Sequence, residues 1–298
     1  MDLSSLSNSK WGTGLVLGAG RMMPARMGHA LGRGIAGRVA ARRDDPLVQA
    51  VRANQWMASR GTLSGEALDQ AVRAMFENDA RYLYDLYHTA QDPEALMSTV
   101  DQDDRFHSLA ERDRGQSIVY ATLHLGNFDL MGRALAYKEQ WCPQLLTVAD
   151  PNSSYEWQND MRGSYGFDVT PVSVESLRQA ARRLAEGGSV LTGMDRPIAG
   201  GKQKPRFFGR AASLPMLHVR LAMKARAPVV VLCAPQDESG RYCVRGSEPI
   251  EMELGRDTAG ATIANAERLL EEAERLIEQW PQQWAMPHAV WPDVVGTV

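Results

Sequence analysis

The chain has 298 residues, of which 44% are hydrophobic and 23% charged, a composition typical of a globular protein with a substantial core. Its three cysteines have no C-x-x-C spacing, which indicates free thiols in a reducing compartment and argues against a zinc or other metal site. The net charge of −3 is uneven, because residues 3–43 hold seven bases and no acid whereas residues 44–298 carry −9. This acidic body argues against nucleic-acid binding, and the basic leader favours an anionic surface.

The leader, residues 1–45, is basic and Gly-rich. No apolar stretch approaches the roughly 20 residues needed to span a bilayer. We therefore expect the leader to lie on a membrane, with its arginines towards the headgroups. Its apolar side would hold Met22, Met23, Met27 and Leu31. A solvated, partly disordered arm is the alternative.

Residues 46–112 are expected to be helical. Between Ser64 and Tyr87 the apolar residues recur with a period near 3.6, which predicts an amphipathic helix, and Ser64 would be its N-cap. These apolar residues are Leu68, Ala71, Val72, Met75, Tyr82, Leu83 and Leu86. Asp92 and Pro93 read as an N-cap followed by proline at the first position of another helix.

After Gly115, short apolar runs alternate with helical patterns. The expected strands are 118–125, 144–148, 167–172, 189–194, 229–234 and 241–244. The expected helices include 174–186, 214–226 and 259–280. This alternation predicts an α/β fold with a central, largely parallel sheet flanked by helices. Residues 46–298 would form one domain, in which a helical region (46–112) precedes a catalytic α/β core (113–298).

The stretch ATLHLGNFDL reads as a strand, a turn and a helix. His124 ends the strand, Gly126 and Asn127 make the turn, and Asp129 lies in the first turn of the helix that Asn127 would cap. Such a turn can fold the carboxylate back to one imidazole nitrogen, which leaves the other nitrogen to take a proton. The alternative is a histidine bound by a backbone carbonyl and an aspartate at the surface.

The same stretch resembles a known motif. HLGNFD is similar to the H-x-x-x-x-D/E motif of glycerolipid-type acyltransferases, and closer still to the bacterial lipid acyltransferases. That family includes the lauroyl and myristoyl acyltransferases of lipid A synthesis and the phosphatidylinositol mannoside acyltransferases. Four later segments resemble the family in the expected order, so that the resemblance runs from about residue 115 to 292: NDMRGSYGFDVTPV, LAEGGSVLTGMDRP, FFGRAASLPMLHVRLAMKARAPVVVL and NAERLLEEAERLIEQWPQQWAMPHAVW.

The resemblance implies an O-acyltransferase with a glycerolipid acyltransferase-like fold. The enzyme would move a fatty acyl group from acyl-CoA or acyl carrier protein to a hydroxyl of a glycolipid or lysolipid, with no other cofactor. His124 would be the general base, oriented by Asp129, and the hydroxyl would attack the thioester directly. The protein would bind peripherally to the anionic cytoplasmic face of the cell membrane.

The resemblance also implies roles for residues beyond the histidine and aspartate. Arg162 would hold a phosphate or the thioester region, and Asp195 would bind an acceptor sugar hydroxyl or tune His124. Amides of the turn that begins at Gly126 would stabilise the developing oxyanion. Further substrate-binding positions are Asn127 and Arg196, and Phe207, Phe208, Gly209 and Arg210 along the acceptor or acyl channel. Two alternatives remain open: Arg162 as a surface base, and the two phenylalanines as plain core.

The sequence departs from the family at several points. Arg196 stands where relatives often have Gln, and Ala289 and Val290 follow His288 in place of basic residues, so a highly phosphorylated acceptor is less favoured. Only the basic leader stands where lipid A members usually have a membrane-spanning helix. The competing functions are a thioesterase or hydrolase with the same dyad and a non-catalytic lipid-binding protein. No G-x-S-x-G nucleophile elbow occurs in the sequence, which argues against a serine hydrolase.

Overall fold

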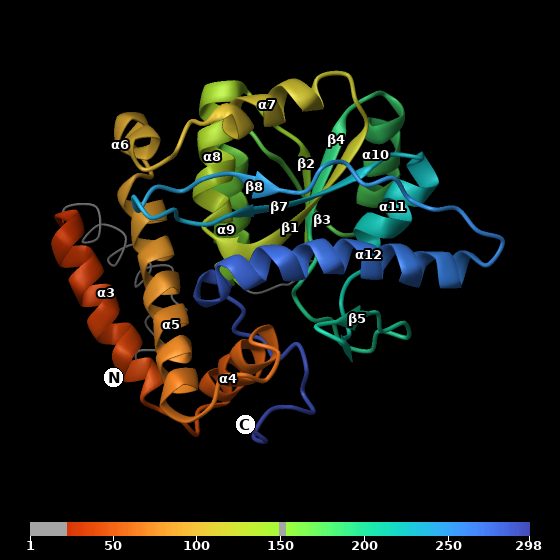
Figure 1. Ribbon diagram of the computed structural model, residues 1–298. Coiled ribbons are helices and arrows are strands. Elements are labelled where there is room, and N and C mark those ends of the chain that lie inside the picture. The colour runs from red at the N-terminus through yellow and green to blue at the C-terminus, as the bar shows by residue number, and fades with distance from the viewer. Residues whose placement is uncertain (1–22, 149–152) are drawn as a thin grey trace.

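The computed structural model describes residues 23–148 and 153–298 and is built around a six-stranded sheet in the order β3-β2-β4-β1-β7-β8 (Figure 1). The first five strands in this order are parallel, and β8 pairs antiparallel with β7. The strands are β1 (Ile118–Gly126), β2 (Gln144–Thr147), β3 (Asp168–Pro171), β4 (Ser189–Gly193), β7 (Val229–Ala234) and β8 (Arg245–Gly246). The predicted α/β fold with a largely parallel central sheet is therefore confirmed.

Helices cover both faces of the sheet. The helices are α3 (Ala25–Ala40), α4 (Pro46–Ala58), α5 (Gly65–His88), α6 (Pro93–Ser98), α7 (Asp104–Asp113), α8 (Phe128–Glu139), α9 (Ser153–Ser164), α10 (Val174–Ala185), α11 (Leu217–Ala225), α12 (Thr258–Gln279) and the 3₁₀ turn η1 (Pro281–Gln283). Alternate residues of β1 enter two cores, with Val119 and Ala121 towards α10, α11 and α12, and Ile118 and Tyr120 towards α7 and α8. Burial on both faces explains why β1 is apolar almost throughout.

Two helix starts follow from the capping residues seen in the sequence. Asp92 accepts a hydrogen bond from the backbone N–H of Ala95, with Pro93 at the first position of α6. Asn127 caps α8 in the same way by accepting from the N–H of Leu130. Ser64 is the N-cap residue of α5, but its side chain makes no capping hydrogen bond.

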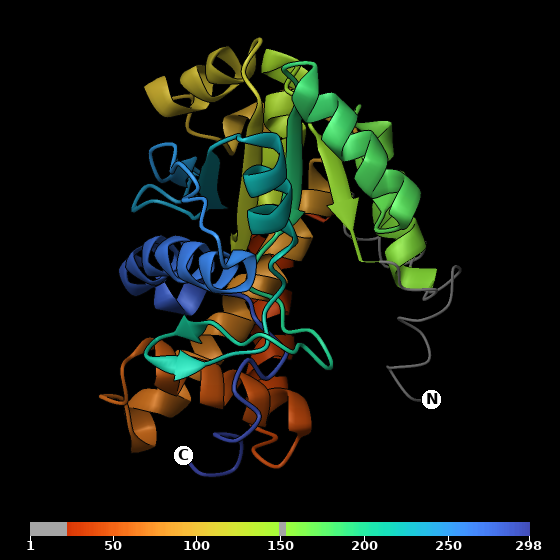
Figure 2. The ribbon, with the colours of Figure 1, turned by 90° about the vertical axis from the view of Figure 1, so that its right-hand side faces the viewer.

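The N-terminal helices and the C-terminal segment pack together below the sheet. Figure 1 shows α3 beside α5, and Figure 2 shows the hairpin of β5 (Arg206–Phe207) and β6 (Arg210–Ala211) between α12 and the N-terminal helices. Asn54 of α4 donates to the backbone oxygens of Met286 and His288. The backbone N–H of Ala285 in turn donates to the oxygen of His124, at 2.8 Å, so the C-terminal segment borders the end of β1.

Two parts of the chain differ from the expectation or lie outside it. The strand expected at 241–244 is wrong, because the ladder with β7 forms only at Arg245–Gly246. The apolar character there comes from Tyr242, which is fully buried and donates its hydroxyl hydrogen to Asp85 of α5. In the leader, Met22 lies outside the described residues. Within the described ranges, no helix combines the length and the apolar character that a membrane span requires.

Candidate active site

The register between β1 and β4 brings His124 and Asp195 together. Thr122 lies opposite Gly193 in the parallel ladder, so His124, two residues further along β1, lies level with Asp195, two residues beyond the end of β4. Nδ1 of His124 is 2.7 Å from Oδ1 of Asp195. The backbone N–H of His124 donates to Oδ2 of the same carboxylate at 2.9 Å. Asp195 therefore fixes both the ring and the backbone of His124.

Asp195 is a fully buried carboxylate with a third donor, the indole Nε1 of Trp284, at 2.8 Å from Oδ2. Burial raises the pKa of Asp195, but the charge of His124 and the hydrogen bonds from His124 and Trp284 outweigh burial and hold that pKa below its usual value. The carboxylate consequently stays ionised at neutral pH and can stabilise a positive charge on the imidazole.

His124 offers its second nitrogen to the outside. Its side chain is 43% exposed, and Nε2 has no hydrogen-bond partner in the described part of the chain. Burial lowers the pKa of His124, yet the adjacent Asp195 raises it by more, so the net pKa lies above the usual value. Because Asp195 binds Nδ1, the neutral ring carries its proton there and Nε2 is the free base.

Asp129, expected to orient His124, pairs instead with Arg162. Its two carboxylate oxygens accept from Nε and Nη2 of Arg162 at 2.6 and 3.0 Å. The expectation that Asp129 holds the imidazole is therefore corrected, since Asp195 binds Nδ1. The physical reason is that Asp129 is the second residue of α8 and its side chain reaches α9, where Arg162 lies. Arg162 is thus neither a solvated surface base nor an unpaired phosphate ligand.

The turn between His124 and α8 requires glycine at position 126. Gly126 has φ of +77°, and a Cβ there would lie 1.8 Å from the backbone oxygen of Ala234, so only glycine fits. The N–H of Asn127 donates to that same oxygen, and its side-chain amide donates to the oxygen of Tyr82. In the residues that the structure describes, the next two N–H groups, of Phe128 and Asp129, have no acceptor.

The segment Phe207–Arg210 forms the β5–β6 turn. Phe207 is fully buried and packs edge-on against Trp284, with ring centroids 5.9 Å apart, and Phe208 is also buried. Gly209 closes the turn with φ of +75°, and Arg210 lies at the surface 3.6 Å from Asp293. The structure thus supports the alternative of plain core for the two phenylalanines, which lie behind the tryptophan that binds Asp195.

Further ionisable side chains act on His124. The positive charges of Arg196 and Arg162 lower its pKa. Burial, Arg196 and His124 together lower the pKa of His288. Burial raises the pKa of Asp79, on α5, to about 6, although the charge of His124 opposes that rise.

Across the described residues, no group of three or more His, Cys, Asp or Glu side chains could hold a metal ion.

Sequence reasoning missed Asp79 and the role of Trp284. Trp284 lies in a segment that carries the family resemblance, but nothing in the pattern pairs it with Asp195. Asp79 is one polar position on an amphipathic helix, where only the packing of α5 reveals its neighbours. No local signal in the sequence could have shown the contact of Trp284 or the position of Asp79.

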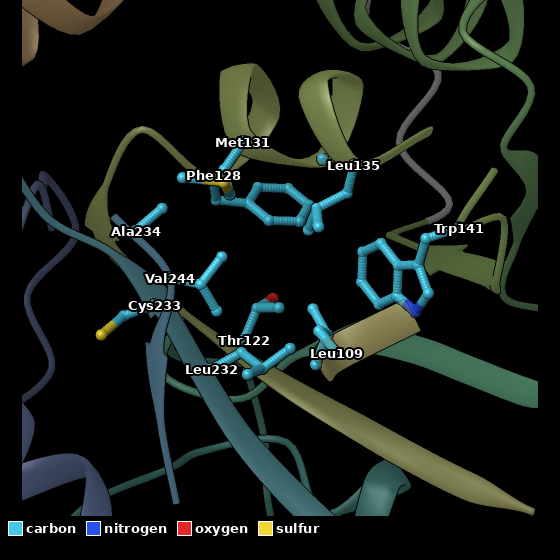
Figure 3. Close-up of a pocket in the computed structure, with 11 residues that line it drawn as sticks. Leu109, Thr122, Phe128, Met131, Leu135, Trp141, Leu232, Cys233, Ala234 and Val244 are labelled. Atoms are coloured by element: carbon cyan, nitrogen blue, oxygen red, sulfur yellow. The ribbon is translucent and has the colours of Figure 1, made fainter. Parts of the chain in front are cut away.

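An apolar pocket lies beside the site, between α8 and the sheet (Figure 3). Phe128, Met131 and Leu135 point from α8 towards Thr122 and Leu232 of the sheet. The open space inside the pocket is small, about 20 Å³. It begins near His124, because Thr122 lies two residues before His124 on β1.

Two comparisons relate the sequence of this chain to known proteins. A family model described as bacterial lipid A biosynthesis acyltransferase matches residues 4–292. The chain is also 26% identical over 289 residues to a phosphatidylinositol mannoside acyltransferase of Mycolicibacterium smegmatis. That match covers 94% of this chain and 91% of the relative.

Proposed function

Because the chain belongs to the bacterial lipid A biosynthesis acyltransferase family and is a lipid acyltransferase, we propose that it acylates a hydroxyl of a glycolipid or lysolipid with His124 as general base. The observation that carries this role is the 2.7 Å contact between Nδ1 of His124 and buried Asp195, which leaves Nε2 open. Asp195 orients the ring and stabilises the imidazolium.

The chemistry needs no acyl-enzyme. Nε2 of His124 takes the proton of the acceptor hydroxyl while the oxygen attacks the carbonyl carbon of an acyl thioester. The C–O bond forms and the carbonyl oxygen becomes an oxyanion. When the intermediate collapses, the C–S bond breaks and the departing sulfur receives the proton from Nε2. The products are an ester and a free thiol.

The first turn of α8 is the proposed oxyanion site. The N–H groups of Phe128 and Asp129 lie at the positive end of the helix dipole and have no acceptor in the described chain. They are better candidates than the amide of Asn127, since the N–H of Asn127 already donates to the backbone oxygen of Ala234. The pair of Asp129 with Arg162 holds this turn against α9.

The apolar pocket beside α8 is the proposed site of the acyl chain. Its lining is almost wholly apolar, which suits a fatty acyl group, and Phe128 connects it to the proposed oxyanion site. Because the open space is only about 20 Å³, lining side chains such as Phe128 and Met131 would move aside to admit the chain. The donor would be acyl-CoA or acyl carrier protein, because either carries the same thioester. No resident cofactor enters this mechanism.

We propose that α3 binds the membrane surface peripherally, at the cytoplasmic face. Met27, Leu31 and Ile35 are each more than half exposed and follow one another at four-residue spacing, so they form one apolar stripe. The helix also carries Arg26, Arg33 and Arg38 and no acidic residue. An apolar stripe with basic neighbours fits an anionic lipid surface.

The test is acyl transfer by the purified protein to a panel of extracted lipids. Labelled acyl-CoA and labelled acyl carrier protein are offered separately, and mass spectrometry identifies the acylated lipid. We expect an ester product with the wild type and none with His124→Ala. A His124→Ala variant that transfers at the wild-type rate would refute the role of His124. Release of free fatty acid without any lipid ester would instead favour a thioesterase.

A further inference from the structure

We propose that Asp79 binds a hydroxyl of the acceptor's sugar, next to the hydroxyl that His124 deprotonates. This inference rests on the proposed function and narrows its acceptor to a hydroxyl-rich, uncharged group at this position. Nothing in the sequence motifs assigns Asp79 a role, because it lies on α5, far from them in the chain.

The position of Asp79 follows from its neighbours on α5. Asn78 donates to the backbone oxygen of Gln282, and Tyr82 accepts at its backbone oxygen from the side chain of Asn127. These two contacts fasten one turn of α5 to both segments that border His124, the C-terminal segment and the start of α8. Asp79 lies within that turn; burial raises its pKa, and the nearby charge of His124 partly offsets that rise.

Asp79 has no structural partner that would explain its burial. The residue is partly buried, yet its carboxylate makes no hydrogen bond or ion pair with any described residue. Asp85, another acid of α5, differs because it binds His29 and Tyr242. None of the fully enclosed, unpaired polar atoms of the described residues belongs to Asp79, so its oxygens stay open to solvent or to a ligand. Partial burial still disfavours its charged form. Binding residues commonly carry such a cost because their partner arrives with the ligand.

Chemistry identifies the ligand that suits this carboxylate. An ionised carboxylate only accepts hydrogen bonds, and its two oxygens can accept from two neighbouring hydroxyls. It repels phosphate, so neither the phosphates of coenzyme A nor a phosphorylated headgroup fits there. The acceptor must bring one hydroxyl to Nε2 of His124, and a sugar carries further hydroxyls beside that one. Asp79 would therefore select a sugar over a lone alcohol.

The experiment compares two acceptors in detergent micelles, octyl mannoside and octanol, with a labelled acyl-CoA or acyl carrier protein. The variants are Asp79→Asn and the matched control Glu77→Gln, which removes the same charge from the same helix at a residue that pairs with Arg73. We expect Asp79→Asn to raise KM for octyl mannoside by about tenfold and to leave KM for octanol unchanged. Glu77→Gln should alter neither value.

Thermal unfolding gives a second, independent readout. Loss of an unpaired carboxylate should leave the melting temperature of Asp79→Asn equal to or above that of the wild type. A lower melting temperature than that of Glu77→Gln would mean that Asp79 stabilises the fold, and would overturn the proposal. An unchanged KM for octyl mannoside, equal effects on both acceptors, or wild-type transfer to octanol alone would also overturn it. By contrast, wild-type protein that transfers to no hydroxyl at all refutes the proposed function itself.

Discussion

Two aspartates lie near His124 in the sequence or in the fold, and each binds a different basic side chain. Asp195, after β4, is fully buried and binds His124 and Trp284. Asp129, in the first turn of α8, is partly exposed and binds Arg162 with both oxygens. The aspartate close to His124 in sequence thus supports the architecture around the site, whereas the distant one acts on the imidazole. Exchanging each carboxylate for an amide separates these roles.

The largest loss in the rate of acyl transfer is expected for Asp195→Asn. The amide cannot stabilise the imidazolium, and it can hold the ring in the wrong tautomer, so kcat for acyl transfer should fall about 10³- to 10⁴-fold. The measurement is steady-state transfer, with circular dichroism to confirm that the variant is folded. A loss no greater than that of Asp129→Asn would contradict the proposed role.

A smaller effect on rate is expected for Asp129→Asn. The change leaves the largely buried guanidinium of Arg162, whose side chain is 15% exposed, without its counter-charge. The free energy of unfolding should fall by about 1–3 kcal/mol, and kcat by roughly 10- to 100-fold as the first turn of α8 loosens. Urea unfolding and steady-state kinetics measure the two quantities. Unchanged stability would show that the ion pair does not hold α8 to α9.

The smallest effect is expected for Trp284→Phe. This variant removes one of the three hydrogen bonds to Asp195 but keeps an aromatic ring against Phe207. A single hydrogen bond to a charged group predicts a loss in kcat of about tenfold. The same kinetic assay provides the measurement. A loss as large as that of Asp195→Asn would mean that Trp284 does more than support the carboxylate.

Most of the fold could be predicted because hydrophobic periodicity reflects burial. β1 and β7 are apolar along their length since both of their faces are covered. The same reasoning failed at 241–244, where apolar residues are buried beneath α5 without a sheet ladder. Periodicity reports burial and cannot distinguish these two causes.

The site was harder to predict, because its main contact depends on strand register. The segments IVYATLH and SVLTGMD align residue for residue in the parallel ladder, from Ile118 opposite Ser189 onwards, which brings His124 level with Asp195. One sequence alone does not state which strands are neighbours. The short spacing between His124 and Asp129 therefore suggested a local pair, although Arg162 binds that aspartate.

In the proposed mechanism Asp195, and not Asp129, sets the pKa of His124. The most direct test is an NMR titration of His124 in the wild type, Asp195→Asn and Asp129→Asn. Asp195 raises the pKa of His124, so the wild-type ring stays protonated to a higher pH than a usual histidine, and activity should rise as pH increases through that pKa. We predict that Asp195→Asn lowers the pKa, because burial then acts unopposed, and that Asp129→Asn changes it much less. A larger decrease in Asp129→Asn than in Asp195→Asn would contradict the assignment.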